Sequence, residues 1–141
     1  MSETPTGNGH VGLVLVSHSA AIAHGLAEFV TQVAGPDVAI VAAGGGPDGT
    51  LGTDGAKVLE ALRGLVAGGG PGAVVLMDLG SSVLSVRAAL QELNAAESER
   101  IVVVDAPFVE GAISAGVTAS TGASRDDVAA AAEEARGASK L

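Results

Sequence analysis

Four short apolar runs alternate along the chain with segments in which apolar residues recur every three or four positions. Short continuous apolar runs are typical of strands that are buried on both faces of a parallel sheet. A spacing of three and four is that of the buried side of a helix. The pattern therefore predicts strands over residues 11–16, 38–42, 73–77 and 101–104, with helices between them.

Three helical segments carry a clear apolar stripe, and we expect each stripe to face the sheet. The stripes are Ile22, Leu26, Phe29, Val30 and Val33; Val58, Leu62, Leu65 and Val66; and Val83, Val86, Leu90 and Leu93. Polar residues occupy the opposite side of the second segment, at Lys57, Glu60 and Arg63. Pro107 suits the start of a further helix, and Ser124 with Asp127 resembles a capping box for a last helix.

Alternating strands and helices predict an α/β fold, in which a mainly parallel four-stranded sheet is covered by helices on both faces. A chain of 141 residues fits a single domain. We assign residues 1–10 to a flexible N-terminal lead-in, residues 11–136 to the domain and residues 137–141 to a tail.

Composition narrows the classes of function. The formal net charge is −9, with seven Lys and Arg, which disfavours binding to nucleic acid and to anionic membranes. The chain has no cysteine, so thiol chemistry and disulfides are excluded. No apolar run approaches the roughly 20 residues of a membrane span, and residues 1–10 lack the pattern of a signal peptide. We therefore expect a cytoplasmic protein.

Candidate chemistry lies in the loops that follow the strands, because ligands of parallel sheets bind beyond the carboxyl ends of strands, where the strand order reverses. His18 follows the first strand and Asp78 follows the third. If these strands are neighbours, Asp78 can accept a hydrogen bond from one imidazole nitrogen of His18 and leave the other free to attack. An unperturbed histidine, with a pKa of about 6.5, is mostly neutral near pH 7 and needs no strong base.

A phosphate site is predicted next to this pair. Gly80, Ser81 and Ser82 open the third helix, where free amides and hydroxyl groups form a cradle for an anion. Ser17 and Ser19 flank His18 and are assigned to the same site. Helix-terminus stabilisation of about 0.3–1 kcal/mol, and up to about 2 when partly buried, would hold a phosphoryl group without trapping it.

Simpler interpretations stand beside this one. A histidine after a strand is commonly an ordinary loop residue, and Asp78 could be a helix N-cap with no chemical role. The glycines at 44–46 match neither a Walker A loop nor a dinucleotide fingerprint, which favours a flexible rim. No histidine pair has metal-ligand spacing, and Ser17-His18-Ser19 lacks the nucleophile elbow of serine hydrolases.

Four segments together resemble one family. They are Val14-Leu15-Val16-Ser17-His18-Ser19, Gly52-Thr53-Asp54, Met77-Asp78-Leu79-Gly80-Ser81 and Ala106-Pro107-Phe108-Val109-Glu110-Gly111. In this order and spacing they resemble the phosphotransferase subunits of bacterial dihydroxyacetone kinases, the DhaM family, whose domain is of the mannose-type EIIA family. Each segment is weak alone, but the four are specific jointly. The resemblance covers residues 11 to about 132.

The resemblance implies a homodimer whose His18 becomes phosphorylated. The phosphoryl group would come from phosphoenolpyruvate through enzyme I and the histidine phosphocarrier HPr. It would pass to ADP on the nucleotide-binding subunit, DhaL, and the ATP formed would phosphorylate dihydroxyacetone on a third subunit. Asp78 would orient His18, and Gly80 with Ser81 would line the phosphate site. We expect no cofactor on this chain, and any Mg²⁺ would belong to the nucleotide-binding partner.

Two alternatives remain open at this point. A mannose-type EIIA domain of a sugar-uptake system would use the same chemistry on His18 with a different acceptor. In that branch the histidine usually lies in Thr-His-Gly, whereas this chain has Ser17-His18-Ser19, which favours the kinase branch. A flavodoxin-like module that binds a small ligand without covalent modification is the alternative from another class.

Overall fold

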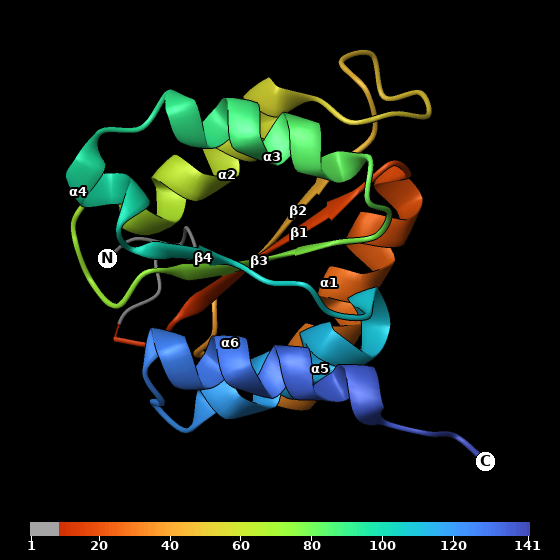
Figure 1. Ribbon diagram of the computed structural model, residues 1–141, viewed down its shortest axis with the longest axis vertical. Coiled ribbons are helices and arrows are strands. Elements are labelled where there is room, and N and C mark those ends of the chain that lie inside the picture. Colours follow the sequence, from red (N-terminus) through yellow and green to blue (C-terminus); the bar gives the residue numbers. More distant parts are fainter. Residues whose placement is uncertain (1–8) are drawn as a thin grey trace.

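The four strands form one parallel sheet between two layers of helices (Figure 1). In this computed structural model, which describes residues 9–141, the strands are β1 (Gly12–Ser17), β2 (Ile40–Gly44), β3 (Ala73–Met77) and β4 (Ile101–Val103). Their order is β2-β1-β3-β4, and every pair is parallel. The α/β prediction is therefore confirmed. Most of the expected lead-in, residues 1–8, lies outside the described residues.

The strand limits differ from the sequence pattern by at most two residues. The largest shift is in β2, where the pattern starts at Val38 and the strand starts at Ile40. Val38 and Ala39 are buried, as an apolar run predicts, but they precede the ladder, whose first pair joins Leu13 to Ile40. Burial and pairing are separate properties, and an apolar run reports only the first.

The helices divide between the two faces of the sheet. One face is covered by α1 (Ala20–Ala34), α5 (Phe108–Ser120) and α6 (Arg125–Glu134). The other is covered by α2 (Gly55–Val66) and α3 (Ser82–Gln91), with the short α4 (Ala95–Ser98) beside them. The sequence pattern did not indicate α4, which a capping box between Asn94 and Glu97 starts. A 3₁₀ turn, Ala135–Gly137, follows α6.

Alternate residues of β1 contribute to two separate cores. Leu13 and Leu15 face the layer of α1, α5 and α6, whereas Val14 and Val16 face α2 and α3. All six residues of β1 are buried, because the strand is central in the sheet and covered on both faces. Ser124 accepts a hydrogen bond from the Asp127 amide and starts α6 as predicted. Pro107 is the N-cap of α5, so the helix begins at Phe108, one position after the expected start.

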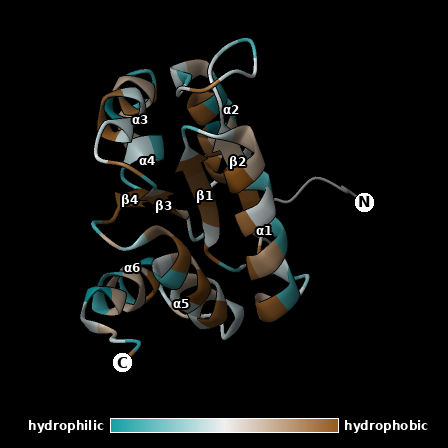
Figure 2. Ribbon diagram, turned by 90° about the vertical axis from the view of Figure 1, so that its right-hand side faces the viewer, coloured by the Kyte–Doolittle hydropathy of each residue, from teal (hydrophilic) through white to brown (hydrophobic). Residues whose placement is uncertain are grey.

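The apolar stripe of α1 corrects one expectation. Leu26 and Val30 are buried, but Ile22, Phe29 and Val33 are between 49% and 54% exposed. Figure 2 shows hydrophobic bands along the outward side of this helix. The apolar positions of α1 span more of its circumference than the sheet and α5 cover. In α2, by contrast, the whole stripe of Val58, Leu62, Leu65 and Val66 is buried.

Among residues 9–141, the helices are too short or too polar for any of them to cross a lipid bilayer.

Candidate active site

His18 and Asp78 lie side by side at the carboxyl end of the sheet. Val16 of β1 pairs with Met77 of β3, so the residues that follow these two strands are neighbours. The helix after β1 is on one face of the sheet and the helix after β3 is on the other. The two connections therefore diverge, and they leave between them the crevice where ligands of such sheets bind.

The His18 ring is held through its Nδ1 atom. Nδ1 lies 3.0 Å from Asp78 Oδ1, and the His18 backbone amide donates to Asp78 Oδ2 at 2.9 Å. Because an ionised carboxylate only accepts hydrogen bonds, the shared proton belongs to Nδ1, and the lone pair of the neutral ring is on Nε2. The His18 side chain is 20% exposed, so the ring is supported by the protein and partly accessible to solvent.

Five donors surround the Asp78 carboxylate. Besides the His18 ring and amide, they are the Leu79 amide and the hydroxyls of Ser17 and Ser82. Burial of the carboxylate raises its pKa, but the hydrogen bonds outweigh this and hold the pKa of Asp78 at about 2, below its ordinary value of 3.8. Asp78 is therefore ionised near neutral pH.

The hydroxyls of Ser17 and Ser19, both predicted to bind phosphate, already have partners in this structure. Ser17 Oγ donates to Asp78 Oδ2 at 2.9 Å and accepts from the Ser19 amide at 3.0 Å. Ser19 Oγ accepts from the Ile22 amide as the N-cap of α1. Both side chains thus support the position of His18, one through Asp78 and the other by fixing the start of the helix.

Ser81 is the side chain nearest to the free nitrogen. Its Oγ lies 2.8 Å from His18 Nε2, whereas the buried Ser82 lies 3.4 Å from Nδ1 and donates to Asp78. The amides of Ser82 and Val83 donate to the carbonyls of Leu79 and Gly80 within the turn. At this helix start, the Ser81 hydroxyl therefore contacts Nε2, while those two amides are already bonded within the turn.

Residues 44–52, the glycine-rich loop, are bonded to the site, although the sequence indicated only a flexible rim. The Gly45 amide donates to the Ser17 carbonyl at 3.1 Å, and the Gly52 amide donates to the His18 carbonyl at 2.9 Å. Thr53 Oγ1 lies 2.6 Å from Ser85 Oγ of α3, which joins the loop's end to the helix that carries Ser81. In the sequence, the signal for these contacts was Gly52-Thr53-Asp54, one of the four segments that resemble the DhaM family.

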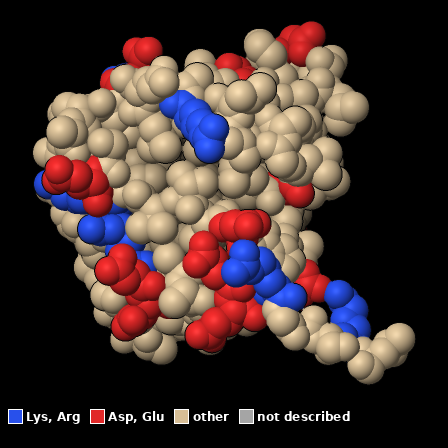
Figure 3. All heavy atoms as spheres, viewed as in Figure 1, with Lys and Arg blue, Asp and Glu red and all other residues tan. Residues whose placement is uncertain are grey.

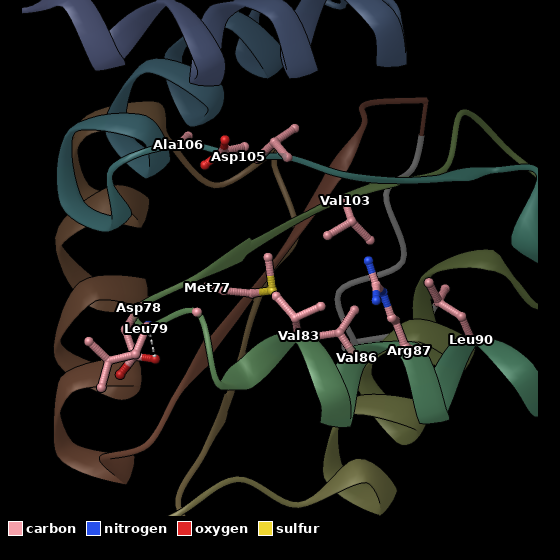
Figure 4. A pocket seen from close by; sticks show the side chains of 12 residues that line it. Met77, Asp78, Leu79, Val83, Val86, Arg87, Leu90, Val103, Asp105 and Ala106 are labelled. Atoms are coloured by element: carbon pink, nitrogen blue, oxygen red, sulfur yellow. Dashed lines mark hydrogen bonds between the residues drawn. The ribbon is translucent and has the colours of Figure 1, made fainter.

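A groove leads away from the site along α3. Its volume is about 470 Å³, and it starts at Asp78 and Leu79 and continues between α3 and the edge strand β4 (Figure 4). Its walls are mainly apolar, with Arg87 reaching toward Val103. Figure 3 shows that most charged side chains of this face gather below the sheet, where α6 lies, and few lie over α3.

One protein family matches most of the chain. The family model EIIA-man, described as "PTS system fructose IIA component", matches residues 12–129. This region contains every strand of the sheet, His18, Asp78 and the serines around them.

Curated relatives carry one description. The chain is 38% identical, over 89% of its length, to the "PEP-dependent dihydroxyacetone kinase, phosphoryl donor subunit DhaM" of Providencia stuartii, but it spans only 26% of that protein. It is 33% identical, over 84% of its length, to a DhaM phosphoryl donor subunit of Listeria innocua, of which it spans 93%. DhaM proteins thus occur both at about this length and as much longer chains.

Solved structures match the fold. The crystal structure of EF1359, a protein of unknown function, has a TM-score of 0.78 and 31% identity, with 94% of this chain and 97% of that one covered. The mannose/sorbose-specific IIA subunit of Enterococcus faecalis has a TM-score of 0.58 at 19% identity, with 94% of both chains covered, which shows a shared fold. The chain belongs to the EIIA-man family and, within it, to the DhaM phosphoryl donor subunits of dihydroxyacetone kinases.

Proposed function

We propose that this chain is a phosphoryl carrier. His18 accepts a phosphoryl group from phospho-HPr and transfers it to ADP held by DhaL, the nucleotide-binding subunit of a dihydroxyacetone kinase. One observation carries the proposal: the ring is fixed at Nδ1 by Asp78, 3.0 Å away, while Nε2 faces Ser81 at the start of α3. The DhaM relatives, described as phosphoryl donor subunits, support the same assignment.

In the first step, the lone pair on Nε2 attacks the phosphorus of the donor phosphohistidine. The Nε2–P bond forms as the donor's P–N bond breaks, and that electron pair returns to the donor ring. The His18 ring keeps its Nδ1 proton and takes up positive charge, which the ionised Asp78 at 3.0 Å stabilises. Phosphoryl transfer of this kind depends mainly on positioning and charge stabilisation, which this site supplies.

In the second step, an oxygen of the terminal phosphate of ADP attacks the phosphorus, and the P–Nε2 bond breaks. The electron pair returns to Nε2, so His18 regains the tautomer that Asp78 fixes. Ser81, 2.8 Å from Nε2 in the unphosphorylated protein, exchanges this contact for one with a phosphoryl oxygen. The Ser81 hydroxyl and the turn at Gly80 hold the phosphoryl group loosely enough for it to leave.

The finer assignments belong to the same proposal. The carrier works in the cytoplasm as a homodimer, receives its phosphoryl group from HPr and delivers it to DhaL. Other DhaM relatives in which this chain spans about a quarter of the length have further sequence beyond the matched region. The net charge of the chain, −9, supports a protein partner rather than nucleic acid.

A labelling assay tests the carrier function. We expect phosphoenolpyruvate, enzyme I and HPr to give the purified chain one acid-labile phosphate. His18→Ala should abolish labelling, whereas His24→Ala should leave it unchanged, because His24 is exposed on α1 and takes no part in the hydrogen bonds around Asp78. Labelling that survives in His18→Ala would refute the site, and an unlabelled wild-type chain would refute the function.

A chase separates the kinase from the sugar-uptake branch. Label on His18 should move to ADP only after a DhaL subunit is added, and the ATP formed can be counted by a coupled assay. Transfer to the sugar-transport component of a mannose-type system, with no transfer to ADP, would assign the chain to the other branch.

A further inference from the structure

The glycine-rich loop has a fixed shape. It closes on itself where the Gly46 amide donates to the Thr50 carbonyl at 2.7 Å. Its two ends are bonded to adjacent residues of the site, Gly45 to the Ser17 carbonyl and Gly52 to the His18 carbonyl. These two hydrogen bonds hold the loop at a defined place beside His18, at the edge of the site.

Lys57 of α2 holds the base of the loop. Its Nζ donates to the Gly46 carbonyl at 2.8 Å and to the Gly44 carbonyl at 3.3 Å. The three ion pairs in the described part of the chain, residues 9–141, involve other side chains. The Asp48 carboxylate of the loop attracts this ammonium without forming an ion pair with it. An ammonium that bridges two carbonyls forms charge-assisted hydrogen bonds, which are stronger than neutral ones.

The loop is backed on one side and open on the other. A Cβ atom on Gly44 would lie 2.7 Å from Ala23 Cβ and 2.8 Å from the Ser19 carbonyl oxygen, so the loop base lies directly against the start of α1. On the open side, Leu51 is 83% exposed. The loop therefore presents an apolar side chain immediately before Gly52, the residue bonded to His18.

Two further exposed leucines adjoin the site. Leu79 is 58% exposed and follows Asp78, and Leu84 is 74% exposed and lies in the first turn of α3 after Ser81 and Ser82. A donor protein must bring its phosphorus to about 3–3.5 Å from Nε2, which places its surface over these side chains. Buried apolar side chains at the centre of an interface commonly carry much of the binding energy.

We propose that Lys57 is a positioning residue, which holds the glycine-rich loop so that Leu51 forms part of the docking surface for the phosphoryl donor protein. This inference rests on the proposed carrier function. It assigns the loop to partner recognition and leaves the chemistry to His18 and Asp78. The partner is a protein with a complementary apolar patch around its own phosphohistidine.

The test compares a protein donor with a small one. Phospho-HPr needs the docking surface, whereas phosphoramidate, which can transfer its phosphoryl group to a histidine with loss of ammonia, does not. For Lys57→Met we expect the KM for phospho-HPr to rise about tenfold, because the loop loses its charge-assisted contact, with kcat within about twofold. The rate of labelling by phosphoramidate should stay unchanged. Lys57→Arg should recover most of the affinity.

Two further variants separate the parts of the proposal. Leu51→Ser should also raise the KM, but only Lys57→Met should speed hydrogen exchange of the Gly52 amide. Arg63→Met, on the same helix, is the matched control and should change neither quantity. Circular dichroism establishes that each variant is folded.

The outcomes are distinguishable from those of the carrier assay. A labelled wild-type chain with an unchanged KM in Lys57→Met would overturn this inference and keep the carrier function. An equal fall in labelling by both donors would assign Lys57 to the support of His18 and overturn the docking role. An unlabelled wild-type chain would remove the carrier function and this inference with it.

Discussion

The two helical layers are joined to the sheet by residues of different size. In the layer of α2 and α3, the core consists largely of valine and leucine, with Leu62 and Val66 fully buried. In the layer of α1, α5 and α6, the helices contribute mainly alanine, at Ala112, Ala115, Ala119, Ala129 and Ala132. Small residues let helices approach closely, and Gly116 of α5 is close enough to α1 that a Cβ atom would lie 2.5 Å from Val30 Cγ1.

This difference explains where apolar surface remains. Because α5 faces the core with alanine and glycine, several larger side chains of α1 and α5 lie outside the contact, and Phe29, Val33, Val109 and Val117 are 43–51% exposed. The site lies where the two layers part, with His18 leading into α1 and Ser81 leading into α3. Each layer thus supplies one half of the site. If the layers differ in packing, substitutions in them should differ in their effects.

The largest expected effect is a loss of stability in the layer of α2 and α3, whose core is mainly valine and leucine. Leu62→Ala removes a fully buried side chain and should lower the free energy of unfolding by about 2–5 kcal/mol. Phe29→Ala, in the other layer, removes a half-exposed side chain and should cost less than about 1 kcal/mol. Urea titrations followed by far-UV circular dichroism measure both, since the chain has neither Trp nor Tyr. Equal losses would remove the distinction between the layers.

The next largest effect is on the rate of phosphoryl transfer at the site between the two layers. Asp78→Asn removes the charge that stabilises the ring during transfer, so phosphorylation of His18 should slow by about 10- to 100-fold, as expected for about 1.5–3 kcal/mol. Rapid-quench measurement of labelling by phospho-HPr gives the rate. The variant should remain folded by circular dichroism. A wild-type rate in Asp78→Asn would show that the carboxylate does not act in the transfer.

Glycine substitutions probe the close contact of the alanine layer. Gly116→Ala places a methyl group against Val30 and should cost about 1–3 kcal/mol through overpacking. Gly25→Ala, on the exposed side of α1, meets nothing within 4 Å and should stabilise the helix by about 0.5–1 kcal/mol. Opposite signs in thermal unfolding are the expected result. If Gly116→Ala left the free energy of unfolding unchanged, α1 and α5 would be able to separate at little cost.

The smallest effect is the pH dependence that Asp78 confers. Its folded pKa of about 2 is lower than its ordinary value of 3.8, so the carboxylate stabilises the fold above about pH 4 and loses this contribution as the pH falls toward 2. With allowance for solvent screening, the loss should be about 1–2 kcal/mol. Unfolding at a series of pH values should show this slope in wild type and not in Asp78→Asn. Parallel profiles would contradict the assignment.

Much of the fold could be predicted, because apolar runs and helical spacing report burial directly. The limits of each element were less certain, as Val38 shows: it is buried and yet outside the strand. The exposure of Ile22, Phe29 and Val33 could not be predicted either. Periodicity places apolar residues on one side of a helix, but the neighbours decide how much of that side is covered.

The site was predictable in its main pair and less so in its hydroxyl groups. His18 and Asp78 could be placed together once the first and third strands were taken as neighbours, which the pairing of Val16 with Met77 confirms. A hydroxyl takes whichever partner the turn brings near, and this is why the partners of Ser17 and Ser19 were not foreseen. Lys57 lies on the polar side of α2, as expected, but its long side chain reaches back to two carbonyls of the glycine-rich loop that precedes the helix.

The central position of β1 has a consequence for repeated turnover. The strand is buried along its whole length and bonded to a neighbour on each edge, so it opens only when most of the molecule unfolds. The imidazole follows this strand directly and returns to the same place after every cycle. Adaptation to a new partner must therefore arise in the surrounding loops, while the reacting nitrogen stays in the same position.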